Sequence, residues 1–264
     1  MQAENRLGAT LAESIENLNI QVRSHVTDAK LRIQLAELLS MAGNLTRADL
    51  QLEAAARINP SLQNWITIFR HLLRAEQSRR DLFEQGRVPE FVGSPTPLLT
   101  SHLKALVALR QGHGDEAANL LALAETQRSS PGRICNGQRV EEFRDMNDLT
   151  AHFFEVLTGA GAYFWIAFDQ IATMRFLPPQ RPRDLLWCRA IVSVRQGPQG
   201  EVFIPALYAG SHEETNSDTI RCGKATDWIN VEGGVVRGLG QRCFLAGEAD
   251  LPIMSLETLG FSTS

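Results

Sequence analysis

The first 128 residues carry a helical pattern of apolar positions. Between residues 30 and 60 the apolar side chains recur on one helical face, first as Leu31, Leu35, Leu38, Leu39 and Ala42, then as Ala48, Leu52, Ala55 and Ala56. Gly43–Asn44 interrupts this pattern, and Pro60 ends it because the residue before a proline disfavours helical backbone. The pattern predicts two antiparallel helices joined by a short turn.

The same helix pair recurs 69 residues later. Four positions match at this offset: Ala36, Gly43, Ala48 and Leu52 reappear as Ala105, Gly112, Ala117 and Leu121. The offset is close to twice the roughly 34-residue period of tetratricopeptide (TPR) repeats. We therefore predict a TPR-like α-helical domain over residues 1–128. Stacked helix pairs leave a groove that usually holds a peptide or helix of another protein; the alternative is an array that only packs against the second half.

After residue 128 the pattern changes to short strand-like runs. Asn136–Gly137 is a strong hairpin signal, and aromatic and β-branched residues fill later runs such as 163–168 and 171–176. One helix is expected at 149–157, where the apolar positions share a helical face. The pattern predicts a β-rich C-terminal domain over residues 129–264, an antiparallel sheet or open barrel with a short helix. The fold class is therefore α+β with two domains.

The stretch "GGVVRGLGQR", residues 233–242, has the glycines and arginines of a phosphate-binding loop. Such a loop needs a helix N-terminus after it, whereas "QRCFLAGE" is strand-like. The lysine of a P-loop and the third glycine of a dinucleotide fingerprint are absent from the stretch. Gly233–Gly234 is better explained as the turn of a two-residue β-hairpin.

Composition narrows the choice of partners and compartment. A net charge of −4 argues against nucleic acid or an anionic membrane as the main partner. The start of the chain lacks the pattern of a secretory signal, and no run of about 18 apolar residues occurs, so we expect a cytoplasmic protein. The four cysteines are widely spaced and predict neither a zinc site nor a redox pair. We expect no cofactor and no metal.

The search for catalytic residues yields one weak candidate. Ser211, His212 and Glu213 have the composition of a nucleophile, a base and an acid, but adjacent side chains rarely converge. A polar loop explains them better, so we predict no catalytic residue and no enzyme. The alternative is a small-ligand or metal-dependent enzyme domain centred on these three residues.

Two groups of residues are candidates for contacts with a partner. Trp65 and Phe69 share a helical face at i and i+4 and would suit either an interface or the core. The second group comes from the β-rich half and consists of Trp187, His212, Trp228, Arg237 and Arg242. These residues could form a recognition patch, but we favour a role in holding turns together.

The C-terminal half also resembles a known family. The phrases "EEFRDMNDL", "PPQRPRDLLWCRA", "GEVFIPALYAGSHE", "VRGLGQRCFL" and "LPIMSLETLGF" occur in this order. Together they are similar to the ImpE family, also called TagJ, although Ala209 stands where that family would have proline. The helical half is similar too, so the resemblance covers nearly the whole chain.

The resemblance implies a non-enzymatic accessory protein of the bacterial type VI secretion system. Its implied partners are a short N-terminal helix of the small sheath subunit (TssB/VipA) and the AAA+ ATPase that recycles the sheath (ClpV). No catalytic residue is implied. A generic TPR scaffold that acts outside secretion is the remaining alternative.

Overall fold

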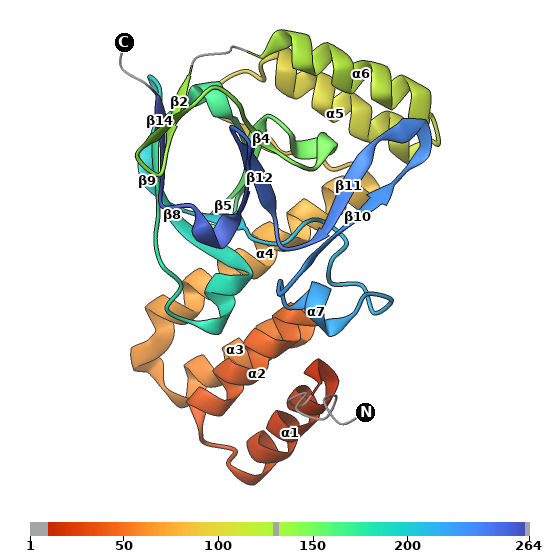
Figure 1. Ribbon diagram of the computed structural model, residues 1–264. Coiled ribbons are helices and arrows are strands. Elements are labelled where there is room, and N and C mark those ends of the chain that lie inside the picture. The colour runs from red at the N-terminus through yellow and green to blue at the C-terminus, as the bar shows by residue number, and fades with distance from the viewer. Residues whose placement is uncertain (1–9, 129–131, 262–264) are drawn as a thin grey trace, which may run out of the picture.

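The structure is a computed structural model that describes residues 10–128 and 132–261 (Figure 1). The helices of the described residues are α1 (Leu11–Ser24), α2 (Ala29–Met41), α3 (Leu45–Ile58), α4 (Gln63–Gln85), α5 (Pro97–Arg110), α6 (Gly114–Gln127) and α7 (Asp218–Arg221). No helix in this part of the chain has both the length and the apolar content that crossing a membrane requires.

The predicted helix pairs are present as α2–α3 and α5–α6. The bounds of α6 lie 69 residues after those of α3 at both ends. Each turn contains a glycine with a left-handed backbone, Gly43 at φ 80° and Gly112 at φ 76°. Glycine suits these turns because it has no Cβ to clash in that conformation.

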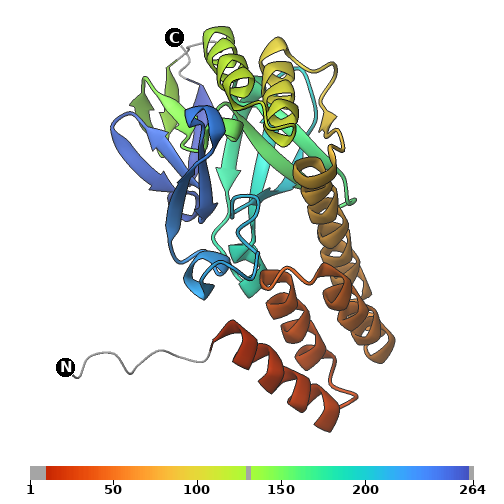
Figure 2. The same cartoon turned by 90° about the vertical axis from the view of Figure 1, so that its right-hand side faces the viewer.

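The two pairs lie at opposite ends of the long helix α4 (Figures 1 and 2). α4 has 23 residues and ends at Gly86, which is left-handed with φ 80°. A solenoid would stack successive pairs directly on each other. The TPR-like character of the helical half therefore stays a prediction, while the repeated helix hairpin is a feature of the structure.

The β-rich part contains three sheets within the described residues. Its strands are β1 (Glu90–Phe91), β2 (Arg133–Cys135), β3 (Gln138–Val140), β4 (Phe143–Asp145), β5 (Phe153–Thr158), β6 (Tyr163–Ala167), β7 (Ile171–Phe176), β8 (Trp187–Val194), β9 (Gln199–Pro205), β10 (Thr226–Asn230), β11 (Val236–Gly240), β12 (Cys243–Ala246), β13 (Ala249–Pro252) and β14 (Thr258–Phe261).

The large sheet has the order β1-β6-β5-β9-β8-β7-β14-β2-β3, and the smaller ones are β13-β12-β4 and β10-β11. Every pairing between these strands is antiparallel except that of β1, which comes from the helical half and runs parallel to β6. The strands curve around an apolar interior (Figure 1). The α+β class is confirmed, whereas the open barrel stays a prediction.

Strand β5 separates two apolar cores. Phe153 and Leu157 pack with the buried faces of the helices. Phe154 and Val156 point the other way, into the core between the large sheet and the β4–β12 sheet. Successive side chains of a strand alternate between its two faces, so one strand serves both cores. The helices thus share a core with the sheet, and the boundary at residue 128 stays a prediction.

The prediction of a helix at 149–157 is wrong. Residues 148–150 form a short 3-10 turn, η2 (Asp148–Thr150), and 153–158 form β5. The residues of β5 from Phe153 to Leu157 are all buried, and an apolar run buried on both sides shows no strand alternation. The short helix of the β-rich half is α7 instead.

The predicted hairpins are confirmed, one of them with a longer loop. Asn136–Gly137 joins β2 to β3, with both residues at positive φ. β10 and β11 pair from Asn230↔Val236 onward, so Gly233–Gly234 lies in a five-residue connection, 231–235, rather than in a two-residue turn.

Candidate functional site

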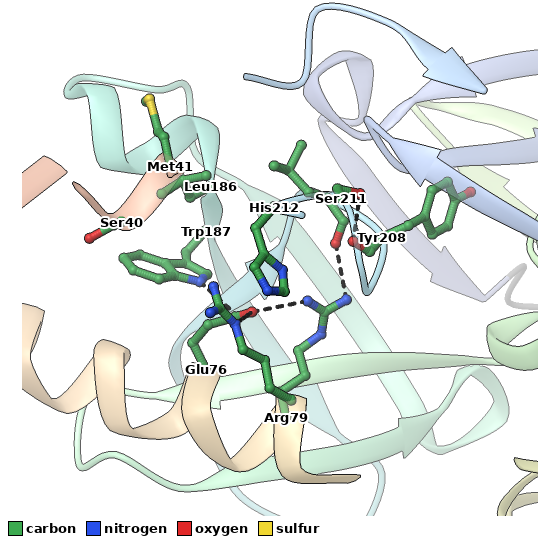
Figure 3. Close-up of a pocket in the computed structure, with 11 residues that line it drawn as sticks. Ser40, Met41, Glu76, Arg79, Leu186, Trp187, Tyr208, Ser211 and His212 are labelled. Atoms are coloured by element: carbon green, nitrogen blue, oxygen red, sulfur yellow. Dashed lines mark hydrogen bonds and ion pairs between the residues drawn. The ribbon is translucent and has the colours of Figure 1, made fainter. Parts of the chain in front are cut away.

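A small cavity lies at the seam, the boundary where α2 and α4 meet the large sheet and the loop after β9 (Figure 3). The cavity is lined by Ser40, Met41, Glu76, Arg79, Arg80, Leu186, Trp187, Leu207, Tyr208, Ser211 and His212. Its volume is about 30 Å³. Pockets for small organic ligands measure roughly 300–1,000 Å³, so this one has room for water but not for a substrate.

Ser211 is a structural residue of this seam. Its hydroxyl donates to the backbone oxygen of Tyr208 at 2.7 Å and accepts from the backbone N–H of Gly240 at 2.8 Å. The side chain is buried, and no hydrogen bond joins it to His212 within the described residues. Ser211 and His212 therefore do not form the nucleophile–base pair that an enzyme of this kind would need.

His212 packs against the turn of the first helix pair. A Cβ added at Gly43 would lie 2.5 Å from Cδ2 of His212. Burial, with Arg80 as the next cause, lowers the pKa of His212 to about 4. The imidazole is therefore neutral at neutral pH. No group of three or more His, Cys, Asp or Glu side chains in residues 10–128 and 132–261 is arranged to hold a metal ion.

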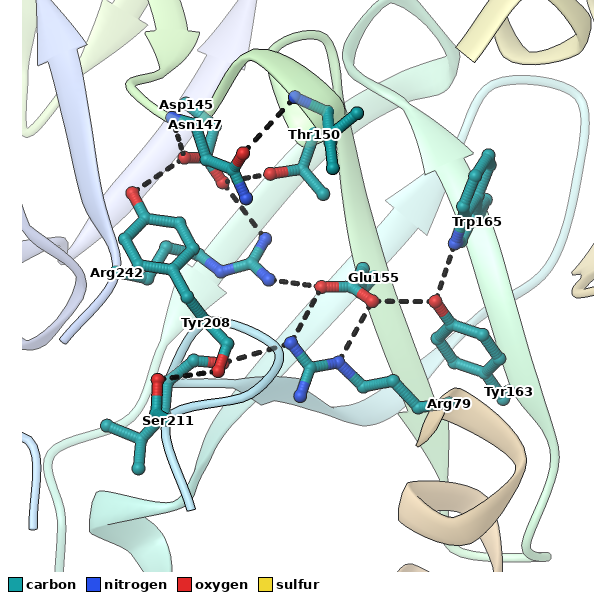
Figure 4. A network of polar contacts seen from close by, with 12 residues as sticks. Arg79, Asp145, Asn147, Thr150, Glu155, Tyr163, Trp165, Tyr208, Ser211 and Arg242 are labelled. Atoms are coloured by element: carbon teal, nitrogen blue, oxygen red, sulfur yellow. Dashed lines mark hydrogen bonds and ion pairs between the residues drawn. The ribbon is translucent and has the colours of Figure 1, made fainter. Parts of the chain in front are cut away.

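A network of buried charges joins α4 to the sheet (Figure 4). Glu155 on β5 is bidentate to Arg79 of α4, with distances of 2.9 Å to Nε and 3.0 Å to Nη2. The other guanidinium, Arg242, lies between β11 and β12 and also pairs with Glu155. All three side chains are buried. A carboxylate between two guanidinium groups therefore links a helix to two separate parts of the β-rich half.

The second carboxylate of the network is Asp145 at the end of β4. It accepts from Arg242 Nη1 at 3.0 Å and from the Tyr208 hydroxyl at 2.8 Å. Thr150 Oγ1 and the backbone N–H of Asn147 each donate to it at 2.9 Å. These two carboxylates face the guanidinium groups of Arg79 and Arg242, and such pairing is the condition for keeping charges inside a protein.

Glu155 and Arg79 hold each other ionised. Burial by itself would raise the pKa of Glu155, but Arg79 and Arg242 outweigh it and bring the value to about 2. Burial opposes the charge of Arg79 too, yet the nearby carboxylates Glu155 and Glu76 leave its pKa raised. Glu155 and Arg79 are therefore charged at neutral pH, whereas burial outweighs Arg242 and raises the pKa of Asp145.

Glu76 connects this network to the cavity. It accepts from Trp187 Nε1 at 3.2 Å and from Arg79 Nη1 at 3.3 Å. Arg79 also donates to the backbone oxygen of Leu207 at 3.0 Å. Through these bonds Arg79 fixes α4 relative to strand β5 and to the loop after β9.

A different polar contact joins α5 and α6 to the sheet. Nε2 of His102 on α5 lies 3.0 Å from Nδ1 of His152, and Nε2 of His152 lies 2.8 Å from Glu125 of α6. Both histidines are buried. Burial, followed by the neighbouring His152, lowers the pKa of His102 to about 3. This contact is therefore made by neutral imidazoles.

The structure brings part of the predicted contact residues together in the interior. The rings of Trp65 and Phe69 are 5.8 Å apart, and those of Phe69 and Trp187 are 5.9 Å apart. Trp187 therefore belongs with the helical pair and not with the second group. The guanidinium groups of Arg181 and Arg183 lie 4.7 Å and 4.4 Å from the Trp65 ring, close enough for cation–π interaction.

Three of the candidate contact residues are buried; the sequence left a core role open for Phe69 and favoured a structural role for Trp187 and Arg242. Phe69 and Arg242 are 0% exposed and Trp187 is 3% exposed, because they fill the core and the charge network. Trp65, His212 and Arg237 are half-buried, and Trp228 is 37% exposed. Of these candidates, Trp228 is therefore the most accessible to a partner, and the three half-buried residues are accessible in part.

Several residues of the seam were not anticipated from the sequence, namely Arg79, Asp145, Glu155, Tyr208 and Tyr163, whose hydroxyl donates to Glu155 at 2.6 Å. Glu155 offered one signal, since it is a lone carboxylate in the apolar run "FFEVLT". A charge at such a position needs a buried partner. The partners lie 76 and 87 residues away in the chain, so the sequence could not name them.

The fold and the seam together define a class of protein. It is an α+β protein in which buried ion pairs fasten the helices to a large sheet, and the seam between them is too closely packed to hold a substrate. Residues 137–260 match the ImpE protein family. This match confirms the resemblance to the ImpE family that was seen in the sequence.

Two relatives extend the similarity to nearly the whole chain. The type VI secretion system accessory component TagJ of Pseudomonas aeruginosa (strain PAO1) is 28% identical over 263 residues, which are 99% of this chain and 91% of that protein. The crystal structure of protein VPA1032 from Vibrio parahaemolyticus has a TM-score of 0.88 at 27% identity and covers 96% of this chain and 94% of its own. The helical half is thus part of the similarity.

Proposed function

We propose that this chain is a non-enzymatic accessory protein of a type VI secretion system. The observation that carries the proposal is the 28% identity to the accessory component TagJ over 99% of this chain. The seam supports it, because the cavity of about 30 Å³ is too small for a substrate and Ser211 bonds to backbone groups instead of His212.

The proposed partner is the N-terminal helix of the small sheath subunit, a TssB/VipA-like protein, and the sheath-recycling AAA+ ATPase (ClpV-like) is a proposed second partner. A helix that binds another protein lays its apolar face against an apolar hollow. An open hollow of about 730 Å³ lies between the α1–α2 turn and the end of α3. Val26, Ala29 and Ile58 supply its apolar lining, and Val26 is 58% exposed.

The test is calorimetric titration of the full chain with the N-terminal helical peptide of the cognate small sheath subunit. We expect saturable 1:1 binding that is lost when the apolar face of the peptide is replaced by serine. Val26→Glu should weaken binding at least tenfold, because it places a charge in the hollow. The matched control is Leu123→Glu, a similar change at a 47% exposed residue on α6.

Three outcomes separate the parts of the proposal. No heat with the peptide, together with binding to the purified ATPase, would reject the sheath helix and keep the accessory role. Equal binding by Val26→Glu and the wild-type chain would reject the hollow as the docking place. Failure to bind either partner, or the assembled sheath, would contradict the proposed function.

A further inference from the structure

The hairpin formed by β10 and β11 is held firmly along its inner edge. The backbone N–H of Val236 donates to Asp148 at 2.8 Å, and that of Gly240 donates to Ser211 at 2.8 Å. The Gly240 oxygen accepts from the N–H of Tyr208 at 3.0 Å. The inner edge of β11 is therefore largely satisfied by the rest of the chain.

Close packing at two glycines, Gly238 and Gly233, fixes the hairpin further. A Cβ on Gly238 would lie 2.3 Å from the ring of Tyr208, so that ring packs directly on the strand. At the tip, a Cβ on Gly233 would lie 2.2 Å from the backbone oxygen of Gly114 at the start of α6. The tip reaches the α5–α6 pair (Figure 1). The hairpin is thus positioned in advance, which lowers the entropic cost of binding along it.

The outer edge of β10 faces away from this support. The pairs Ala225–Gln241 and Val231–Val235 are joined by backbone hydrogen bonds. Since bonded and non-bonded residues alternate in an antiparallel ladder, the N–H and C=O groups of Thr226, Trp228 and Asn230 point outward. Among the described residues, the one hydrogen bond that these backbone groups make is from the N–H of Trp228 to the Asp227 carboxylate, at 2.8 Å.

The side chains at this edge indicate what would bind there. Trp228 is 37% exposed, with its ring centroid 5.8 Å from that of Tyr208, and a tryptophan beside a free strand edge is a strong interface anchor. Asp227 is exposed and covers the central outward N–H. An incoming lysine or arginine would draw this carboxylate aside and free the N–H for a strand.

We propose that the outer edge of β10 accepts an extended, basic segment of a partner protein as an added β-strand, with Trp228 as its apolar anchor. Main-chain hydrogen bonds to Thr226, Trp228 and Asn230 supply affinity, and Trp228 and Asp227 supply preference for apolar and basic side chains. This surface lies outside the hollow lined by Val26 and Ile58, so the proposal stands independently of the sheath helix.

The test begins with a displayed library of random ten-residue peptides, selected on the immobilised full chain. The selection is run in parallel on Asn230→Pro, which removes one outward N–H, a change that an edge strand tolerates. We expect enriched peptides that alternate apolar and polar residues and carry lysine or arginine. Synthetic copies should bind the wild-type chain and lose at least tenfold in affinity on Trp228→Ala and on Asn230→Pro. Leu50→Ala, at a residue 57% exposed on α3, is the matched control and should not change binding.

N-methylation of the peptide distinguishes strand addition from side-chain docking without altering the protein. Two peptides are compared, one methylated at the odd-numbered and one at the even-numbered backbone nitrogens. Only every second N–H faces β10, so one pattern should abolish binding and the other should change the affinity by no more than about threefold. The proposal is overturned if no peptide is enriched on the wild-type chain over Asn230→Pro. Equal loss for both methylation patterns overturns it as well, because an added strand would present only every second N–H to β10.

Discussion

The two helix pairs related by the 69-residue repeat are fastened to the β-rich half in different ways. In α2–α3 the turn glycine, Gly43, lies under His212, and its backbone oxygen accepts from Arg80 at 2.7 Å. In α5–α6 the equivalent Gly112 has open space around it. That pair is held instead at Gly114, by the hairpin tip, and at His102.

The repeat therefore encodes the helix hairpin and not the way in which each pair docks on the rest of the protein. The shared positions, such as Ala48 and Ala117, are buried between the two helices of each pair. The docking residues differ between the pairs: position 45 is leucine where position 114 is glycine, and position 33 is isoleucine where position 102 is histidine. Helix α4 lies between the pairs, and its charge network joins it to the β-rich half.

The largest expected effect comes from breaking the charge network of α4 and the sheet. Glu155→Ala leaves Arg79 and Arg242 buried without their common carboxylate and should lower the free energy of unfolding by about 3–5 kcal/mol. Urea denaturation measures the change. Glu201→Ala, which removes the partner of Arg189 at the surface, is the control and should cost less than about 1 kcal/mol. A similar cost for both variants would contradict the network's role.

The second prediction concerns the contact at the hairpin tip. Gly233→Ala and Gly234→Ala both place a side chain on left-handed backbone, at φ 79° and 76°. Only Gly233 has a backbone atom in the way, whereas Gly234 has open space. Gly233→Ala should therefore cost about 1–3 kcal/mol more than Gly234→Ala in the same denaturation experiment. Equal costs would show that the tip is not pressed against α6.

The third prediction is a pH dependence specific to the α5–α6 contact. An unfolded histidine has a pKa of 6.5, and that of folded His102 is about 3, so below pH 6.5 only the unfolded chain gains this proton. Stability is complete above this value and falls as the pH drops from 6.5 toward 3. At pH 5 the loss from His102 is on the order of 2 kcal/mol. Glu155, with its pKa of about 2, stays charged in this window.

Comparing wild type and His102→Gln at pH 7.5 and pH 5 measures this effect. The variant should be less sensitive to pH by about one proton, although His152 and His212, whose pKa values are also lowered, leave some dependence. An unchanged pH dependence in His102→Gln would show that the histidine pair does not govern it.

The smallest effect tests the two turn glycines against each other. Gly43→Ala and Gly112→Ala carry the same left-handed strain, but only the first brings a methyl group to 2.5 Å from His212. His212 is a side chain that can move, so we expect Gly43→Ala to cost about 1 kcal/mol more. Thermal unfolding of both variants in the background of His212→Ala should remove the difference. If it persists there, His212 is not its cause.

The sequence predicted those features that local patterns encode. The helix pairs followed from apolar periodicity with a glycine at the turn, and the hairpin at Asn136–Gly137 followed from two residues that tolerate positive φ. The prediction failed at 149–157, since β5 is buried on both faces and its apolar run fits either a helix or a strand. For Arg242 the sequence favoured a structural role over a recognition patch, but it could not show that Asp145 and Glu155 balance its charge inside the protein.

The sequence by itself thus determined the repeated helix hairpin, the change to β-structure near residue 128 and the resemblance to the ImpE family. The tertiary structure decided which of the charged and aromatic residues are buried, which repeat turn is covered and which strand edge stays open. The physical reason is the distance along the chain over which each kind of interaction acts. Turn and helix preferences act over a few neighbouring residues, whereas the pairing of Arg79 with Glu155 spans 76 residues and exists only once helix and sheet have met.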